Sequence, residues 1–145
     1  MTGNMVRGGN VGSEDAAYEV EQLAKTGVDI QLLDVSGQCY ALVQGIEAPS
    51  PPWNSPRYDI LIAIPAAYAD AALDAFYLGL PYTFHDSTHP RVNGATISVE
   101  NRQWQLTSWH YPDGKPWRRG LDDLDSHITH CRGFFSHRGA INEYR

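Results

Sequence analysis

His110 is the residue of this chain whose type and position point most directly to chemistry. It follows Ser108 and Trp109 at the end of a predicted strand, directly before a loop rich in Gly and Pro. Strand ends beside loops commonly carry functional side chains. Because alternate residues of a strand face the same side, Ser108 and His110 would lie on one face. The spacing predicts a Ser–His pair, and it is equally compatible with a histidine that only orders the loop.

A histidine in this place has two chemical roles open to it. The unperturbed pKa of a histidine is about 6.5, so a mostly neutral ring can act as a general base at cellular pH. The ring can also accept an acyl group itself, which gives an acyl-imidazole that hydrolyses readily. Either role is helped by an acidic residue that orients the ring. Asp113, in the following loop, is the nearest candidate along the chain.

Four of the other histidines form two closely spaced pairs. His85 and His89 lie in a predicted loop, and His127 and His130 lie beside Cys131 in the last predicted helix. A structural zinc site normally has four ligands from two well-separated pairs, and the chain offers no cysteine pair. The pattern favours polar residues at the edge of the core, so no metal or other cofactor is predicted. A histidine-based metal-binding protein remains an alternative function.

The two cysteines, Cys39 and Cys131, are predicted to be buried. Cys39 falls in an early predicted strand, and Cys131 falls on the apolar stripe of the last predicted helix. Free cysteine is among the most buried residue types, so we expect both thiols to be dispensable for function. Two cysteines, together with an N-terminus that lacks the apolar segment of a secretion signal, are typical of a reducing cytoplasm.

A single domain is predicted to position these residues. Residues 1–13 are rich in Gly and are predicted to form a disordered tail, whereas residues 14–145 are predicted to form the domain. Ser13 is a predicted N-cap for a short amphipathic helix over residues 14–25.

Strands and a second helix are predicted to follow. Residues 28–110 are predicted to form an antiparallel meander, with a turn at Asn93-Gly94. A C-terminal helix is predicted over residues 121–136. Its predicted apolar stripe consists of Leu121, Leu124, Ile128, Cys131 and Phe135. The order of helix, strands and helix predicts an α+β domain with helices on one face or end of the sheet.

The charge and hydropathy of the chain argue against two classes of partner. The formal net charge is −6, whereas proteins that bind nucleic acid usually show basic patches. No apolar run approaches the roughly 20 residues that span a bilayer. We therefore predict neither a nucleic-acid nor a membrane partner, and the one basic cluster is formed by Lys115, Arg118 and Arg119.

Two stretches of the chain together resemble a known family. The first stretch is similar to the strand, "Pro-x-x-Tyr-Pro" link and following strand of the ubiquitin-conjugating (UBC) fold. Its matching residues are Asp59, Leu61, Pro65, Tyr68, Asp70, Asp74 and Phe76. Ala69 departs from the pattern, because the family usually has its second proline there. The matching residues of the second stretch are Trp104, Gln105, Ser108, His110, Trp117, Arg118, Gly120 and Asp122. Both stretches resemble the prokaryotic family E branch, and the resemblance covers roughly residues 28–136.

The resemblance implies a UBC-like fold and a place in a bacterial ubiquitin-like protein conjugation pathway. A conjugating enzyme holds its modifier as a thioester on a cysteine thiolate. In the UBC fold that cysteine precedes a tryptophan that Trp117 resembles, and the equivalent position here is Trp109, beside His110. The resemblance therefore implies a component that binds the modifier or its activating enzyme without a cysteine thioester. An active transfer enzyme that uses His110 with Ser108 is the alternative.

The same resemblance implies a set of partners and a functional surface. The implied partners are a ubiquitin-like protein, a ThiF-type activating enzyme and, less directly, a JAB-type peptidase. The implied surface is the segment 108–118 and the residues beside it. In it, His110 and Ser108 are the candidate catalytic residues. The candidate binding residues are Trp109, Trp117, Arg118 and Arg119.

Overall fold

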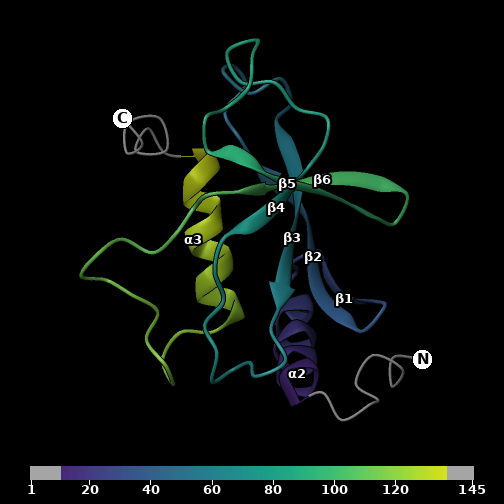
Figure 1. Ribbon diagram of the computed structural model, residues 1–145, viewed down its shortest axis with the longest axis vertical. Helices are drawn as coiled ribbons and strands as arrows, with labels where there is room; N and C mark the ends of the chain where they lie inside the picture. The colour runs from purple at the N-terminus through teal and green to yellow at the C-terminus, as the bar shows by residue number, and fades with distance from the viewer. Residues whose placement is uncertain (1–10, 137–145) are drawn as a thin grey trace.

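The computed structural model describes residues 11–136, which form one six-stranded sheet and two helices (Figure 1). The elements are α2 (Val11–Lys25), β1 (Ile30–Val35), β2 (Gln38–Glu47), β3 (Arg57–Ile64), β4 (Phe76–Gly79), β5 (Val92–Val99), β6 (Arg102–Thr107) and α3 (Leu124–Ser136). All neighbouring strands are antiparallel. The predicted α+β class, with a helix before the strands and another after them, is confirmed, and the arrangement is consistent with a UBC-like fold.

The order of the strands departs from a plain meander. The sheet runs β1-β2-β3-β4-β6-β5, so that β6 lies between β4 and β5. The chain reverses at Glu100 and Asn101, whose φ angles are 56° and 59°. The turn predicted at Asn93-Gly94 is wrong, because these residues lie within β5, at an irregularity in its pairing with β6. Gly94 is needed there for close packing, since a Cβ atom would lie 2.7 Å from Leu106 Cβ.

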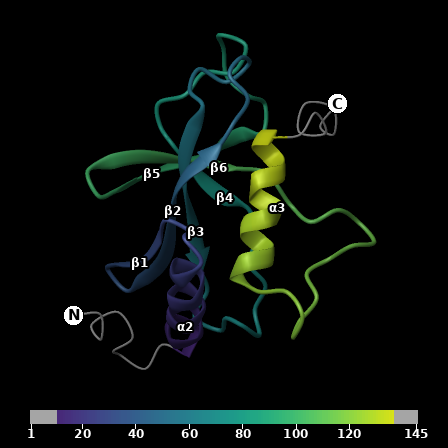
Figure 2. The same ribbon diagram turned by 180° about the vertical axis from the view of Figure 1, so that it is seen from behind.

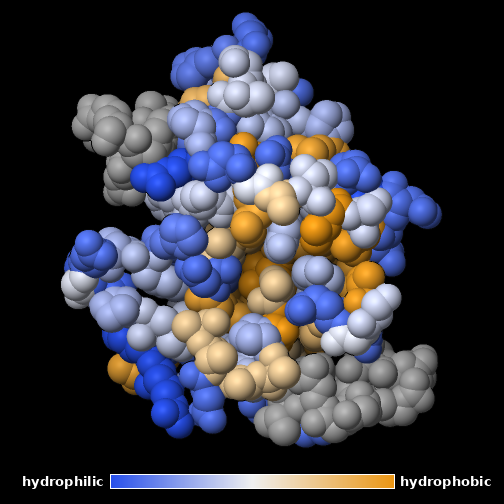
Figure 3. All heavy atoms as spheres, in the orientation of Figure 1, coloured by the Kyte–Doolittle hydropathy of each residue, from blue (hydrophilic) through white to orange (hydrophobic). Residues whose placement is uncertain are grey.

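The two helices cover one face of the sheet. Successive strand residues point to opposite faces, and one set meets the helices in the main core, for example Ile60 and Ile62 with Ile128. The other set forms a smaller cluster around Leu61 and Trp104, with no helical member. Figure 3 shows apolar side chains gathered between the β1–β2 and β5–β6 hairpins on the viewed face.

The last helix begins three residues later than predicted. Asp123 and Ser126 form a reciprocal cap: Ser126 N donates to Asp123 Oδ1 at 2.9 Å, and Asp123 N donates to Ser126 Oγ at 2.9 Å. Leu121 therefore lies before the helix and is 70% exposed, so its place in the predicted apolar stripe is wrong. Ile128 and Cys131 are buried as predicted.

The first helix begins earlier than predicted. α2 starts at Val11, so Ser13 lies inside its first turn rather than at an N-cap position. No proline interrupts the chain here, and the helix extends back through residues that we expected to belong to a tail. The rest of the predicted tail, residues 1–10, lies outside the described residues.

Glu19 of α2 ties three parts of the fold together. Its Oε1 accepts hydrogen bonds from the Tyr68 hydroxyl at 2.6 Å and from Leu124 N at 2.9 Å. These bonds join α2 to the link between β3 and β4 and to the first turn of α3. Burial raises the pKa of Glu19. Within residues 11–136, no helix is long and apolar enough to cross a membrane.

Candidate functional site

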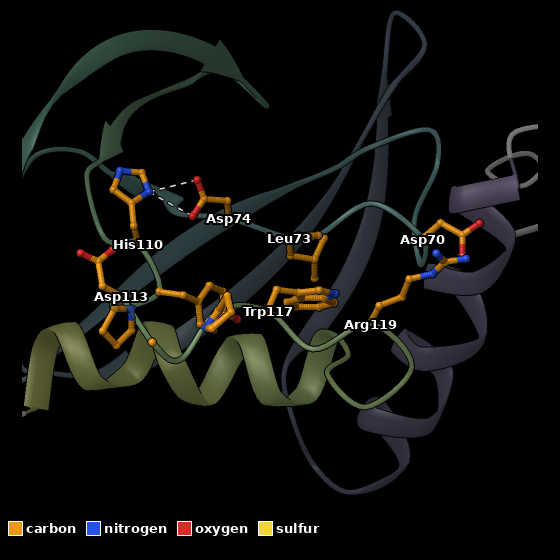
Figure 4. A pocket seen from close by; sticks show the side chains of 12 residues that line it. Asp70, Leu73, Asp74, His110, Asp113, Trp117 and Arg119 are labelled. Carbon is orange, nitrogen blue, oxygen red and sulfur yellow. Dashed lines mark hydrogen bonds and ion pairs between the residues drawn. The ribbon is translucent and has the colours of Figure 1, made fainter.

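His110 and Asp74 meet at the edge of an open cleft (Figure 4). His110 Nδ1 lies 3.0 Å from each carboxylate oxygen of Asp74, and the two side chains are 57% and 56% exposed. An ionised carboxylate only accepts hydrogen bonds, so it favours a proton on Nδ1. The lone pair of the neutral ring then lies on Nε2. The pair can therefore act as an acid–base unit through its outer nitrogen.

The pairing of β4 with β6 brings these two residues together. Phe76 of β4 lies opposite Thr107 of β6, and the strands are antiparallel. The chain before Phe76 therefore runs alongside the chain after Thr107. Asp74 comes just before the first strand position and His110 just after the last one, so they face each other where the ladder ends.

The cleft lies between the β3–β4 link and the loop that follows β6, and its volume is about 730 Å³. Figure 4 shows the Asp74–His110 pair at one end and Asp70 with Arg119 at the other. Arg119 and Asp70 form an exposed ion pair at 3.1 Å. Leu73 lies between the two ends and is buried. The cleft therefore combines an apolar middle with charged ends.

A second cleft lies on the other side of His110 and has a volume of about 840 Å³. Ser108 lines it, but the Ser108 hydroxyl donates to Asn93 Oδ1 at 2.8 Å. The structure thus gives Ser108 a partner other than His110. Asp113, which we expected to orient the His110 ring, lines both clefts. The carboxylate that contacts His110 Nδ1 is instead that of Asp74.

Asp74 is the site residue to which the sequence pattern gave no chemical role. It is 36 positions from His110 in the chain, so local spacing could not link the two. The one signal for it was its place among the matching residues of the first family-like stretch.

Trp109 anchors the segment 108–111 to α3. Its Nε1–H donates to the His130 carbonyl oxygen at 2.8 Å, and its ring stacks on the His130 ring at 5.5 Å. Tyr111 also stacks on His130, with ring centroids 4.1 Å apart. The structure therefore turns this tryptophan toward the helix, where it is half-buried.

Trp117 and the two arginines after it lie in the loop that leads to α3, which runs beside the helix in Figure 2. Trp117 is half-buried and packs edge-on against Tyr68 at 6.3 Å and Tyr111 at 6.0 Å. Arg118 binds Asp122 at 3.1 Å and holds the pKa of that carboxyl below its usual range. Trp117 and Arg119 thus line the first cleft, whereas Arg118 stabilises the approach to the helix.

Neither cysteine lies in the clefts. Cys39 is 4% exposed and Cys131 is 0% exposed, and burial raises the pKa of the Cys131 thiol. His89 and His127 are also buried. Over the described part of the chain, no group of three or more His, Cys, Asp and Glu side chains is arranged to hold a metal ion.

Comparison with known proteins agrees with this architecture. The family model for prokaryotic E2 family E matches residues 16–136 of the sequence. No curated protein and no solved structure matches the chain. An E2-like family works in general with a ubiquitin-like modifier and its activating enzyme. The match spans most of the chain and includes both clefts, so this protein belongs to prokaryotic E2 family E and is a UBC-like component of a conjugation pathway.

Proposed function

We propose that this chain binds the ubiquitin-like protein, or the activating enzyme that delivers it, without forming a cysteine thioester. One observation carries the proposal: both thiols lie in the core, with Cys39 at 4% and Cys131 at 0% exposure. A thioester requires an accessible thiolate, whereas these thiols are shielded, and burial raises the pKa of Cys131. The loop beside the cleft offers His110 instead of a cysteine.

The first cleft is the proposed binding surface. Binding sites combine an apolar surface with a few charged or polar groups that fix orientation. Here the half-buried Trp117 and the exposed Pro116 supply the apolar part, and Arg119 supplies an exposed cation at one end. Aromatic side chains and arginine are enriched at protein interfaces, where they carry much of the affinity.

Calorimetric titration of Arg119→Glu tests this surface. We expect its affinity for the ubiquitin-like protein or the activating enzyme to fall by about tenfold or more, since the charge at one end of the cleft is reversed. Arg57→Glu is the matched control, because Arg57 is also an exposed arginine in a surface ion pair, with Glu47 at 4.0 Å. Equal affinities for the two variants and the wild type would place the binding surface elsewhere.

Acid-quenched intact mass spectrometry tests the absence of a thioester. The chain is mixed with the activating enzyme, ATP and the ubiquitin-like protein, and adducts are weighed before and after treatment with thiol. We expect no thiol-labile adduct, and we expect a Cys39→Ala, Cys131→Ala double variant to retain pathway activity. A thiol-labile adduct that disappears in a folded double variant would show that one of these cysteines is the acceptor.

A second candidate function is general-base catalysis by His110, and the 3.0 Å contact with Asp74 favours it. In this reaction an acceptor amine attacks the thioester carbonyl held on the activating enzyme. His110 Nε2 takes the amine proton while the new C–N bond forms and the C–S bond breaks. The proton then passes to the departing thiolate. Asp74 keeps the ring oriented and stabilises its charged form.

Discharge of the activating-enzyme thioester onto an amine separates the two functions. If His110 is a base, the wild-type chain accelerates discharge and His110→Ala loses about 10²-fold or more of that acceleration. Asp74→Ala should lose activity as well, whereas Ser108→Ala should change little because its hydroxyl bonds Asn93. A wild-type chain that binds but does not accelerate discharge would leave binding alone. A covalent adduct that is trapped by the acid quench and is lost in His110→Ala would identify the ring as an acyl carrier.

A further inference from the structure

His127 is buried beneath the Asp74–His110 pair, and both of its ring nitrogens are engaged. Its Nε2 lies 2.9 Å from the carbonyl oxygen of Ala75, and its Nδ1 lies 2.7 Å from the Tyr111 hydroxyl. A carbonyl can only accept, so Nε2–H donates to Ala75 and Nδ1 accepts from Tyr111. One neutral tautomer therefore satisfies both contacts.

The two partners of His127 are the chain neighbours of the site residues. Ala75 follows Asp74, and Tyr111 follows His110. We propose that His127 is a positioning residue that clamps these two segments and so sets the contact between Asp74 and His110. The role of the Asp74–His110 contact in binding or catalysis rests on the proposed function, whereas the clamp is argued from the hydrogen bonds of His127.

The backbone at Ala75 gives an independent reason for a clamp. Its φ angle is 55°, a left-handed conformation that residues with a Cβ rarely adopt. Such a conformation costs free energy and persists only where the surroundings hold it. The hydrogen bond from His127 fixes the carbonyl of this residue, directly after Asp74.

The helix that carries His127 is itself held firmly. The Asp123–Ser126 cap closes its first turn, and Glu19 accepts a hydrogen bond from Leu124 N. His127 N donates to Asp123 O at 3.0 Å, within the same turn. The clamp therefore joins two loop segments to a fixed point of the fold.

The surroundings keep the clamp uncharged at cellular pH. Burial and, to a smaller extent, the neighbouring His130 lower the pKa of His127, the Ala75 carbonyl, Asp74 and Asp122 raise it, and the net result is a pKa of about 4. Burial also raises the pKa of Tyr111. The donor and acceptor pattern is thus constant over the range in which a cell operates.

Imidazole NMR on the full chain provides the test, through long-range ¹H–¹⁵N correlations measured at alkaline pH, where histidine rings are neutral. In the wild type we expect His110 to be mainly the Nδ1–H tautomer, because Asp74 accepts that proton. In His127→Phe, which fills the space but breaks both hydrogen bonds, we expect Nε2–H to become the major form. Asp74→Ala serves as the reference for a ring without its carboxylate, and His127→Gln, which keeps an N–H donor, should restore part of the Nδ1–H form.

Tyr111→Phe is a second, milder variant that removes only one hydroxyl and keeps the ring that stacks on His130. We expect a smaller shift in the same direction, so the test stands even if His127→Phe fails to fold. A purely structural His127 would lower the melting temperature and leave the His110 tautomer unchanged. An unchanged His110 tautomer in folded His127→Phe would overturn the inference. If His127→Phe does not fold, an unchanged tautomer in Tyr111→Phe would overturn it. The readout needs no partner protein, so its failure is distinct from a failure of binding or discharge.

Discussion

At the scale of single residues, the site depends on groups that the fold keeps neutral. His127 and Tyr111 are hydrogen-bonded to each other in surroundings that oppose the charged form of each. The Asp74–His110 pair, by contrast, is exposed to solvent. The structure thus places an uncharged, hydrogen-bonded layer beside the exposed Asp74–His110 pair.

This arrangement predicts a pH dependence of stability. The pKa of His127 falls from 6.5 to about 4 on folding, so the unfolded chain binds a proton that the folded chain refuses. The free energy of unfolding should therefore decrease as pH falls from about 6.5 to about 4, by about 3 kcal/mol from this residue alone. Above pH 6.5 the contribution is complete and constant.

Urea unfolding at a series of pH values measures this contribution in the wild type and in His127→Phe. We expect the variant to lose much of the slope between pH 4 and 6.5, whatever its absolute stability. Glu19 also titrates near this window, but its raised pKa gives a slope of opposite sign, and it is present in both proteins. Identical slopes in the two proteins would show that His127 titrates normally.

The sequence indicated His110 as a site residue, but it did not indicate Asp74 as its hydrogen-bond partner or His127 as the residue that holds the neighbouring segments. His110 was marked by its place at a strand end, which is a local property. Asp74 reaches it through the β4–β6 register, and His127 contacts the neighbouring Ala75 and Tyr111 through the packing of α3; both are properties of the folded chain. The expected pairing with Ser108 overlooked Asn93, whose amide oxygen lies across the β5–β6 pair.

At the scale of elements, the start of α3 matters most for the site. Asp123 and Ser126 satisfy backbone N–H groups that the first turn would otherwise leave without partners. Asp122 and Asp123 also lie where the helix dipole favours negative charge. Because His127 lies one turn further on, a frayed start of this helix would loosen the clamp.

Ser126→Ala removes the hydroxyl that accepts from Asp123 N, while the bond from Ser126 N to Asp123 Oδ1 stays. It should therefore destabilise the domain by about 1 kcal/mol, the usual net effect of losing one hydrogen bond. Thr129→Ala is the matched control, because Thr129 is an exposed hydroxyl residue of the same helix whose side chain bonds Asp125 O, a backbone group within that helix. We expect the control to be neutral or slightly stabilising, since Ala is the better helix former. Equal effects in chemical unfolding would show that the cap contributes nothing beyond helix propensity.

Element types were predictable from this sequence, whereas boundaries and turns were less so. Periodicity located the strands around Ile30 and Ile60 and the helix that buries Ile128, because each has a strong apolar pattern. The Asn93-Gly94 dipeptide suggested a turn, but packing against Leu106 made use of the missing Cβ instead. Leu121 matched the helical spacing, yet the cap at Asp123 begins the helix after it.

At the scale of the whole molecule, one main core joins the helices to the sheet. Residues of α2, α3 and five of the strands belong to the same buried cluster, from Ala16 to Phe135. The Glu19 hydrogen bonds connect the same parts through polar contacts. The described domain should consequently unfold as one cooperative unit, as small single domains usually do.

Ile128→Asp tests this unity. Ile128 is 2% exposed, so the substitution buries an unpaired carboxylate and should cost about 3–5 kcal/mol, enough to unfold much of a marginally stable domain. Leu121→Asp is the control from the same predicted stripe: at 70% exposure it should change stability by less than about 0.5 kcal/mol. If the core is one unit, Ile128→Asp lowers the protection of amide protons in β2 and β3 together with those in α3, as hydrogen exchange would report. Exchange that accelerates in α3 alone, with the strands still protected, would show instead that the helix and the clamp it carries can open while the sheet stays folded.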